Sequence, residues 1–118
     1  MNPERVAIVG SREPSQWAQE DVVAQITALP PGTIVISGGA VGIDTLAYRA
    51  AVKRGLRTEI FHPEYARYDA RIAPKVRNTI MAAICTRAIC YTAGSKGGTH
   101  DFIRQMRRFD KPFKEMQR

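Results

Sequence analysis

Short, almost wholly apolar runs that alternate with helix-like segments constrain the fold of this sequence more than any other feature. The runs lie at residues 5–9, 33–36, 56–61 and 88–91, and their β-branched and aromatic composition is typical of strands. The segments between them place apolar residues three and four positions apart, which is the spacing of one helical face. Strands without polar alternation are buried on both faces, as in parallel sheets covered by helices. The sequence therefore predicts an α/β fold: a single Rossmann-like three-layer sandwich over residues 1–118, with a mainly parallel sheet of four to five strands.

Four helices are expected between and after these strands. The first covers residues 15–29 and ends before Pro30-Pro31-Gly32, because proline and glycine interrupt helices. Residues 62–74 show no period and predict a long loop, which in a compact domain usually has a function. A short fifth strand is expected from Lys111. The expected buried faces of the later helices are Ile43, Leu46, Ala47, Ala50 and Ala51, then Val76, Ile80, Ala83 and Ile84, then Phe102, Ile103, Met106 and Phe109.

Composition and charge narrow the class of protein. The chain has 118 residues, the size of one domain, of which 44% are hydrophobic and 25% charged, as in globular proteins. Its 18 Lys and Arg residues exceed its 11 Asp and Glu residues, and the net charge of +7 favours anionic partners such as nucleotides or nucleic acid. No run is apolar enough for a membrane span and residues 1–5 lack a signal-peptide pattern, so we expect a cytoplasmic protein without membrane partners. Cys85 and Cys90 are expected to be buried thiols, and no spacing predicts a metal site.

Glycine-rich turns follow the first, second and fourth of the predicted strands. Their amides, hydroxyls and basic side chains are groups that hold phosphates. Because ligands of parallel sheets bind at the carboxyl ends of the strands, we expect the three turns to form one phosphate-binding site. Turn chemistry alone would explain each glycine, but not why all three turns are rich in Gly, Ser and basic residues. The candidate binding residues in these turns are Gly10, Ser11 and Arg12; Ser37, Gly38, Gly39, Gly42 and Asp44; and Gly94, Ser95, Lys96, Gly97, Gly98 and Thr99.

The second and third turns each lead directly into a helix, whose N-terminal amides and partial positive charge favour phosphates. Asp44 lies in the first turn of the second helix, where it either compensates the helix dipole or binds a ribose hydroxyl or a base. Thr99 is expected to be the N-cap of the last helix. The glycine spacing matches neither the dinucleotide-binding fingerprint nor the P-loop, which argues against NAD oxidoreductase and ATPase activities.

Further polar residues are candidates for the same site. Arg77 and Asn78, near the start of the third helix, are expected to grip a phosphate and to pair with a base or ribose; the alternative is a basic helix start without a ligand. Arg77 and Asp101 are the residues considered for catalysis, but no nucleophile is tied to them, so enzyme activity stays open. Aromatic and basic residues alternate in the long loop, which suits either base stacking or simple solvation: Tyr65, Arg67, Tyr68 and Arg71.

These motifs, in this order, resemble the SLOG superfamily, which includes the DNA-processing protein DprA, the LOG cytokinin-activating hydrolases and small YspA-like proteins. The segments that carry the resemblance are Val9 to Arg12, Ser37 to Asp44, Arg77-Asn78 with Met81, and Gly94 to Thr99. Pro63 to Tyr68, leading into Arg77-Asn78, is most similar to the YspA-like branch. The resemblance covers nearly the whole chain. It implies a Rossmann-like domain that binds nucleotides or nucleotide-derived ligands.

Three functions compete at this stage. The main expectation is binding of a nucleotide or an ADP-ribose-like or NAD-like ligand by the turns, without a cofactor. Similarity to the LOG family implies hydrolysis of a nucleoside-monophosphate N-glycosidic bond, but Phe102 occupies the position of that family's Glu and Asp101 is one residue out of register. Similarity to DprA implies single-stranded DNA binding, although DprA carries further segments. The base, the number of phosphates and the pathway are not fixed by the sequence, and a homodimer or higher homo-oligomer suits so small a domain.

Overall fold

Five parallel strands form one sheet in the computed structural model, in the order β3-β2-β1-β4-β5. The structure describes residues 3–92 and 97–117. In chain order the elements are β1 (Arg5–Gly10), α1 (Gln16–Ala28), β2 (Ile34–Ser37), α2 (Ile43–Arg54), β3 (Arg57–Ile60), α3 (Ala73–Ile84), β4 (Arg87–Tyr91), α4 (Gly98–Arg108) and β5 (Phe113–Met116).

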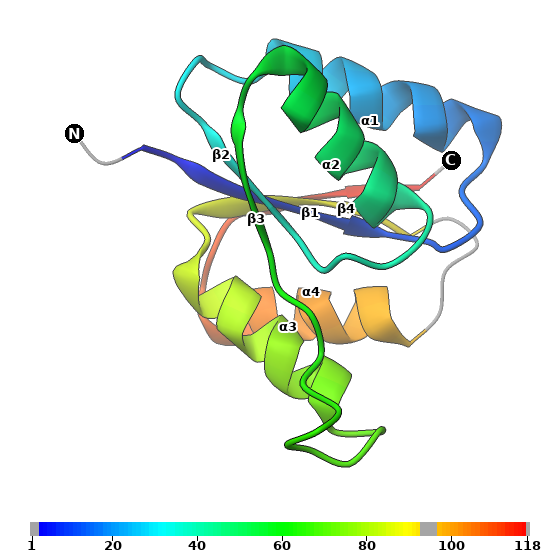
Figure 1. Ribbon diagram of the computed structural model, residues 1–118, viewed down its shortest axis with the longest axis vertical. Coiled ribbons are helices and arrows are strands. Elements are labelled where there is room, and N and C mark those ends of the chain that lie inside the picture. Colours follow the sequence, from blue (N-terminus) through cyan, green and yellow to red (C-terminus); the bar gives the residue numbers. More distant parts are fainter. Residues whose placement is uncertain (1–2, 93–96, 118) are drawn as a thin grey trace.

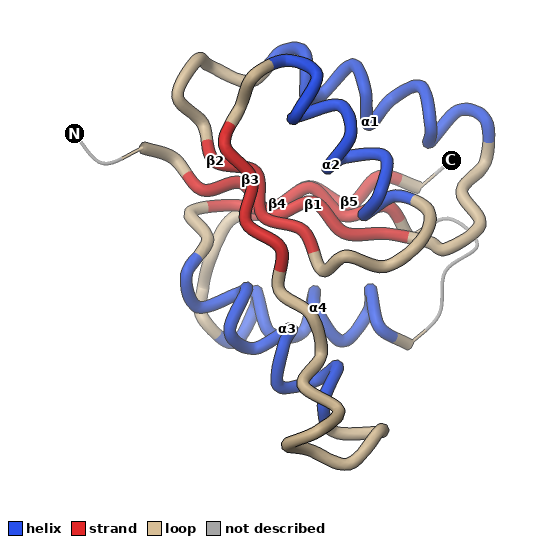
Figure 2. The backbone as a smooth tube through the Cα atoms, in the orientation of Figure 1, coloured by secondary structure: helices blue, strands red, loops and turns tan. Residues whose placement is uncertain are grey.

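The helices cover both faces of the sheet, α1 with α2 on one face and α3 with α4 on the other (Figures 1 and 2). Each strand runs in the same direction, and each crossover to the next strand contains a helix, as parallel pairing requires. The α/β three-layer sandwich and the fifth strand expected from the sequence are confirmed.

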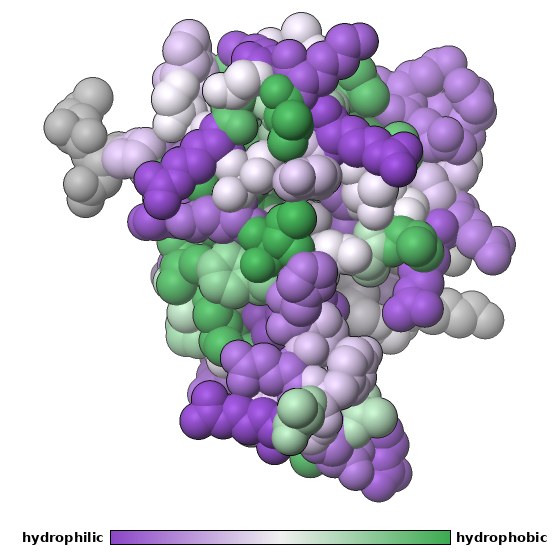
Figure 3. All heavy atoms as spheres, in the orientation of Figure 1, coloured by the Kyte–Doolittle hydropathy of each residue, from purple (hydrophilic) through white to green (hydrophobic). Residues whose placement is uncertain are grey.

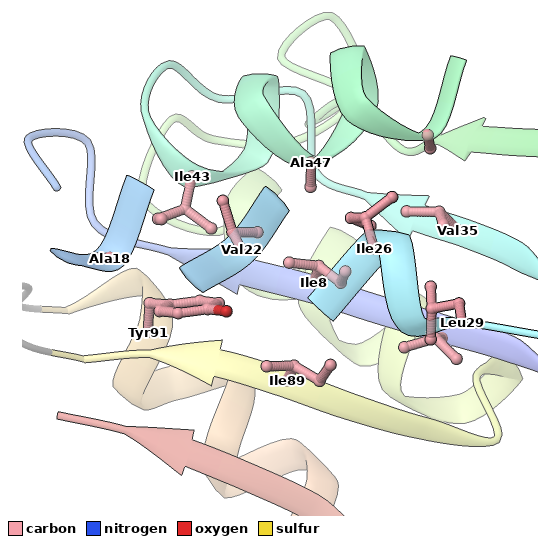
Figure 4. Packing of buried hydrophobic residues seen from close by; sticks show 12 residues of the cluster. Ile8, Ala18, Val22, Ile26, Leu29, Val35, Ile43, Ala47, Ile89 and Tyr91 are labelled. Carbon is pink, nitrogen blue, oxygen red and sulfur yellow. The ribbon is translucent and has the colours of Figure 1, made fainter. Parts of the chain in front are cut away.

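Two hydrophobic layers hold the sandwich together. In the first, α1 and α2 pack onto Val6, Ile8, Val35 and Ile89, with the ring of Tyr91 beneath α1 (Figure 4). In the second, α3 and α4 pack onto the opposite side chains of the same strands. Cys85 and Cys90 are buried free thiols, as expected. Within the described residues, no helix is long and apolar enough to cross a bilayer.

The boundaries of α1 follow its capping chemistry. Ser15 is the N-cap, and its hydroxyl oxygen accepts a hydrogen bond from the Ala18 amide at 3.1 Å, while Leu29 ends the helix before the prolines. The helix therefore lies where the sequence predicts it, with Ala18, Val22 and Ile26 buried.

The buried face of α3 is not the one we expected. Ile80, Ala83 and Ile84 are exposed, whereas Met81 and Ala82 are buried against α4. The apolar pattern was misleading because a polar residue, Asn78, belongs to the buried face and satisfies its amide there. The true face is therefore rotated, and an apolar stripe is left on the outside of the helix.

The topology places a crevice at the centre of one sheet edge. From β1 the chain moves to β2 and β3 on one side, and later to β4 and β5 on the other. The turns after β1 and β4 consequently diverge, and the carboxyl ends of these central strands are where ligands bind in such sheets.

Candidate functional site

A cavity of about 680 Å³ opens at the carboxyl ends of the strands. Of the residues predicted from the sequence, ten line it: Gly10, Ser11, Arg12, Gly38, Gly39, Asp44, Arg77, Asn78, Gly98 and Thr99. Ser37, Gly42 and Gly97 do not line it. Gly94, Ser95 and Lys96 lie outside the described residues. The structure thus brings most of the predicted residues around one space, and their binding roles stay predictions.

The turn after β1 hydrogen-bonds to the start of α2, and the side chain of Arg12 in this turn makes no ion pair with any described residue. Ser11 is buried, its carbonyl oxygen accepts a hydrogen bond from the Ile43 amide at 3.1 Å, and its hydroxyl oxygen accepts one from the Glu13 amide at 3.1 Å. Arg12 is exposed at the cavity and makes no ion pair or hydrogen bond within the described part of the chain. Its guanidinium is therefore available to a ligand.

The turn after β2 depends on glycine for steric reasons. Gly42 has a φ of 87°, and a Cβ there would lie 2.3 Å from the Ser11 carbonyl oxygen. Ser37 organises the same turn, because its hydroxyl donates to the Asp44 carbonyl oxygen at 3.1 Å and accepts from the Gly39 amide at 3.2 Å. Gly42 is the N-cap of α2 and no side chain caps this helix. Ser37 and Gly42 therefore shape the turn rather than face the cavity.

Asp44 and Arg77 form the charged floor of the cavity, with Gly38 between them. A Cβ at Gly38 would lie 2.6 Å from Arg77 Nη1 and 2.9 Å from Asp44 Oδ2, so any larger residue there would displace these two charged side chains. Burial raises the pKa of Asp44 from 3.8 to about 6, although hydrogen bonds from nearby amides and the Arg77 charge oppose the rise. Burial also lowers the pKa of Arg77, and Arg12 adds to this effect while Asp44 opposes it. Two guanidinium groups thus approach the same space as one buried carboxyl.

Some of the guanidinium nitrogens of Arg77 donate hydrogen bonds within the protein, and one does not bond to any described residue. Its Nη1 donates to the carbonyl oxygens of Gly38 at 2.7 Å and Phe61 at 3.3 Å, and its Nε donates to Asn78 Oδ1 at 2.9 Å. Its Nη2 makes no hydrogen bond to any described residue. Arg77 therefore joins the ends of β2 and β3 and keeps one donor for a ligand.

Asn78 fixes the start of α4 against α3. Its side-chain amide donates to the Gly98 carbonyl oxygen and to Asp101 Oδ2, both at 3.1 Å. The other Asp101 oxygen accepts from Arg104 at 3.2 Å, so both carboxylate oxygens are engaged, and Asp101 does not line the cavity. The expectation that Thr99 caps α4 is wrong: the N-cap is Gly97, whose φ of 65° suits glycine, and Thr99 lies in the first turn.

Several cavity residues escaped the sequence-based prediction. They are Glu13, His62, Pro63, Pro74, Met81 and Phe102. His62 follows β3 closely and was within reach of the same strand-end reasoning that found the glycine turns. Tyr65 lines the cavity, with 58% of its surface exposed. Arg67 and Tyr68 line a second, smaller pocket that shares His62 and Arg77 with the cavity. Arg71 lines neither pocket.

The arrangement suits a phosphate-bearing ligand with an aromatic base. Arg12 and Arg77 Nη2 offer charged donors, the glycine turns leave space for close approach, and Tyr65 offers an exposed ring. Within the described residues, no group of three His, Cys, Asp or Glu side chains is placed to hold a metal ion.

Comparison with known proteins gives one consistent family. The sequence model of the family described as DNA recombination-mediator protein A matches residues 1–61. The DNA processing protein DprA of Streptococcus pneumoniae (strain ATCC BAA-255 / R6) is 28% identical over 123 aligned residues, which cover 80% of this chain and 44% of that protein. The chain thus spans less than half the length of this curated relative.

Solved structures share the fold. The X-ray structure of DprA from Streptococcus pneumoniae superposes with a TM-score of 0.82 at 21% identity, over 96% of this chain and 50% of that one. A structure of DNA processing protein A from Helicobacter pylori, described by its single-stranded DNA binding mode, also gives 0.82, at 20% identity, over 97% of this chain and 65% of that one.

Proposed function

This chain belongs to the DNA recombination-mediator protein A family, and from that membership we propose that it binds single-stranded DNA through the cavity at the carboxyl ends of its strands. The resemblance to the SLOG superfamily and its DprA members is confirmed, whereas closeness to the YspA-like branch stays a prediction. The observation that carries the proposal is the convergence of Arg12, Arg77 and Tyr65 on one space of about 680 Å³. That space is large enough to admit a nucleotide unit.

Each group has a distinct role in the proposed complex. Arg12, which is exposed and unpaired within the described residues, binds a backbone phosphate, and Arg77 Nη2 binds the same or the next one. Tyr65 stacks on a base, an interaction available to every base and therefore tolerant of sequence. The net charge of +7 supports a polyanionic partner.

A small nucleotide is the second candidate, because the volume of the cavity also suits a free mononucleotide or ADP-ribose. We do not propose hydrolysis. Phe102 lines the cavity where the LOG family has its Glu, and Asp101 is held by Asn78 and Arg104 outside it.

Fluorescence anisotropy with a labelled oligo-dT of roughly 16 nucleotides tests the proposal. We expect Arg12→Ala to weaken binding roughly tenfold and to lower the slope of log affinity against log salt by about one, because one phosphate contact is lost. Lys53→Ala is the charge-matched control. Lys53 is exposed in the last turn of α2, roughly 14 Å along the helix axis from Asp44, and its loss should have a much smaller effect.

A second pair of variants tests the stacking role. Tyr65→Ala should weaken oligonucleotide binding roughly tenfold, whereas Tyr65→Phe keeps the ring and should bind nearly as the unchanged protein does. Equal losses in Arg12→Ala and Lys53→Ala would exclude the cavity as the DNA site. Salt-tolerant binding of AMP or ADP-ribose without oligonucleotide binding would favour the second candidate instead.

A further inference from the structure

The smaller pocket beside the cavity has a volume of about 100 Å³ and lies between α3 and the chain that follows β3. That chain runs beside the first turns of α3 (Figure 1). Figure 3 shows apolar residues gathered over α3 and the end of β3. The apolar and aromatic side chains that line the pocket include Phe61, Tyr68, Val76 and Ile80. A pocket below the usual range for whole ligands, about 300–1,000 Å³, suits one flat ring.

His62 and Arg77 form the boundary between this pocket and the cavity, because they line both spaces. The His62 ring lies against the turn after β2, where a Cβ at Gly39 would come within 2.8 Å of His62 Cε1. The ring nitrogens of His62 and Arg77 Nη2 make no hydrogen bond to any residue in the ranges 3–92 and 97–117. The boundary therefore offers hydrogen-bond donors to a phosphate that lies between the two spaces.

Tyr68 is held at the pocket by backbone hydrogen bonds on both sides of it. The amides of Arg67 and Tyr68 both donate to the Glu64 carbonyl oxygen at 3.0 Å, which closes a turn. One residue later, the Asp69 carbonyl oxygen accepts from the amide of Ala73, the first residue of α3, at 2.9 Å. The ring of Tyr68 is therefore positioned before a ligand binds, which lowers the entropic cost of stacking.

The charged side chains that line the smaller pocket favour an anionic ligand. Its one carboxylate, Glu64, pairs with Arg67 at 3.6 Å. The guanidinium of Arg67 also lies 5.8 Å from the centre of the Tyr68 ring, within the range of a cation–π contact. With Arg77, the pocket has two guanidinium groups against one carboxylate. The balance of charge therefore attracts a ligand that carries a phosphate beside its ring.

We infer that the smaller pocket binds the base of a second nucleotide, so that the protein holds two consecutive nucleotides of one strand. One base stacks on Tyr65 in the cavity and the next stacks on Tyr68 in the smaller pocket. The phosphate that joins them lies on His62 and Arg77 Nη2 at the boundary. The second subsite rests on the proposed binding of single-stranded DNA, to which it adds the neighbouring base. It also gives a role to Ile80, which is 43% exposed and is covered by the second base.

Titration of the whole chain with two ligands, followed by heteronuclear NMR, tests the second subsite. The dinucleotide pdTpdT has two bases. The control ligand pdTp has one base with a phosphate on each side, so it lacks the second base whichever way the strand runs. Tyr68→Ala should raise the dissociation constant of pdTpdT roughly tenfold and leave that of pdTp unchanged. Tyr68→Phe keeps the ring and should bind both ligands as the unchanged protein does.

Two isoleucines of α3 give a matched pair of variants that tests the apolar wall. Ile80 and Ile84 are 43% and 38% exposed, but only Ile80 lines the smaller pocket. Ile80→Ser should weaken binding of pdTpdT severalfold without changing that of pdTp, because apolar contact with the second base is lost. Ile84→Ser should change neither. Circular dichroism reports whether each variant is folded.

The outcomes separate the second subsite from the proposed function. Equal losses of pdTpdT and pdTp in Tyr68→Ala, or no loss of either, overturn the second subsite. If oligo-dT binding depends on Arg12 but is the same in Tyr68→Ala and the unchanged protein, the proposed function stands and the second subsite fails. If no DNA ligand binds the unchanged protein, both fail.

Discussion

The buried carboxyl of Asp44 should make the protein less stable as the pH rises through about 6. Asp44 is 5% exposed, and burial raises its pKa in the folded state from 3.8 to about 6. The folded state therefore binds the proton more tightly than the unfolded chain does. The stabilisation by this proton is fully present below pH 3.8 and is lost as the pH rises through about 6.

The size of the effect follows from the two pKa values. The gap between 3.8 and about 6 corresponds to roughly 3 kcal/mol of unfolding free energy, since one pKa unit is about 1.4 kcal/mol. This is a large share of the stability of a small domain, which is typically about 5–15 kcal/mol. The amides that point at the carboxylate and the charge of Arg77 have already reduced the cost of burial.

The effect is measured by urea unfolding of the unchanged protein and of Asp44→Asn at several values between roughly pH 3.5 and pH 7. This range spans roughly the interval over which a carboxyl with this pKa titrates. Other acidic groups titrate in both proteins, so the difference between the two curves isolates Asp44. Asparagine offers fewer hydrogen-bond acceptors to the nearby amides, which shifts the stability of Asp44→Asn at every pH. The test is therefore how the stability difference between the two proteins changes with pH, and its absolute size is not used. We expect the difference to change by roughly 3 kcal/mol in favour of Asp44→Asn as the pH rises.

The matched control is Glu20→Gln, which neutralises an exposed carboxylate on α1. An equally large change in this control would show that the effect does not come from burial. Parallel curves for the unchanged protein and Asp44→Asn would refute the reasoning, because Asp44 would then ionise equally easily in the folded and unfolded states.

Two further predictions concern the turn after β2 and the Asp44 carboxyl at the floor of the cavity. Gly42→Ala should destabilise the protein by roughly 3 kcal/mol or more, because it adds both backbone strain and a clash with the Ser11 carbonyl. Gly32→Ala is its control: Gly32 has a φ of 86° with open space around it, so urea unfolding should show a loss of only about 1–2 kcal/mol. Oligonucleotide affinity should rise as the pH falls from 7 to 5, because protonation of Asp44 removes a negative charge from the cavity, and anisotropy should find a flatter dependence in Asp44→Asn.

The fold was predictable because its signals are local. The apolar strands, the Ser15 cap and the prolines after α1 each act within a few residues, and together they indicate alternating strands and helices. The order of strands in the sheet is not local, since it depends on which faces pack. The outer flank of α3 shows the same limit: a count of apolar residues favoured Ile80 and Ile84 as core, whereas hydrogen bonding buries Asn78.

The location of the cavity was predictable from the fold class, because glycine turns at the ends of parallel strands gather at one edge. The cap of α4 was not, because serine and threonine preferences favour Thr99 and the positive φ of Gly97 is invisible before the backbone is known. Phe102 and Met81 were missed as cavity residues for a similar reason. An apolar side chain on a helix gives no local sign of whether it faces the core or a cavity.

A sequence also cannot tell which polar side chains have hydrogen-bonding groups left over for a ligand. In this site, that difference separates residues proposed to bind a ligand from residues that hold the fold in place. Asn78 and Ser37 were candidates of the same standing as Arg12, yet their side chains are engaged within the protein. Ser37 bonds backbone groups of Asp44 and Gly39. Asn78 bonds the Gly98 carbonyl oxygen and the side chains of Arg77 and Asp101. Arg77 stands between these classes, with Nη1 and Nε committed and Nη2 free within the described structure. Loss of Asn78 should therefore act through the geometry of the α4 start and Arg77, whereas loss of Arg12 should remove a ligand contact and leave the fold intact. The stability of each variant, measured beside its affinity, distinguishes the two roles.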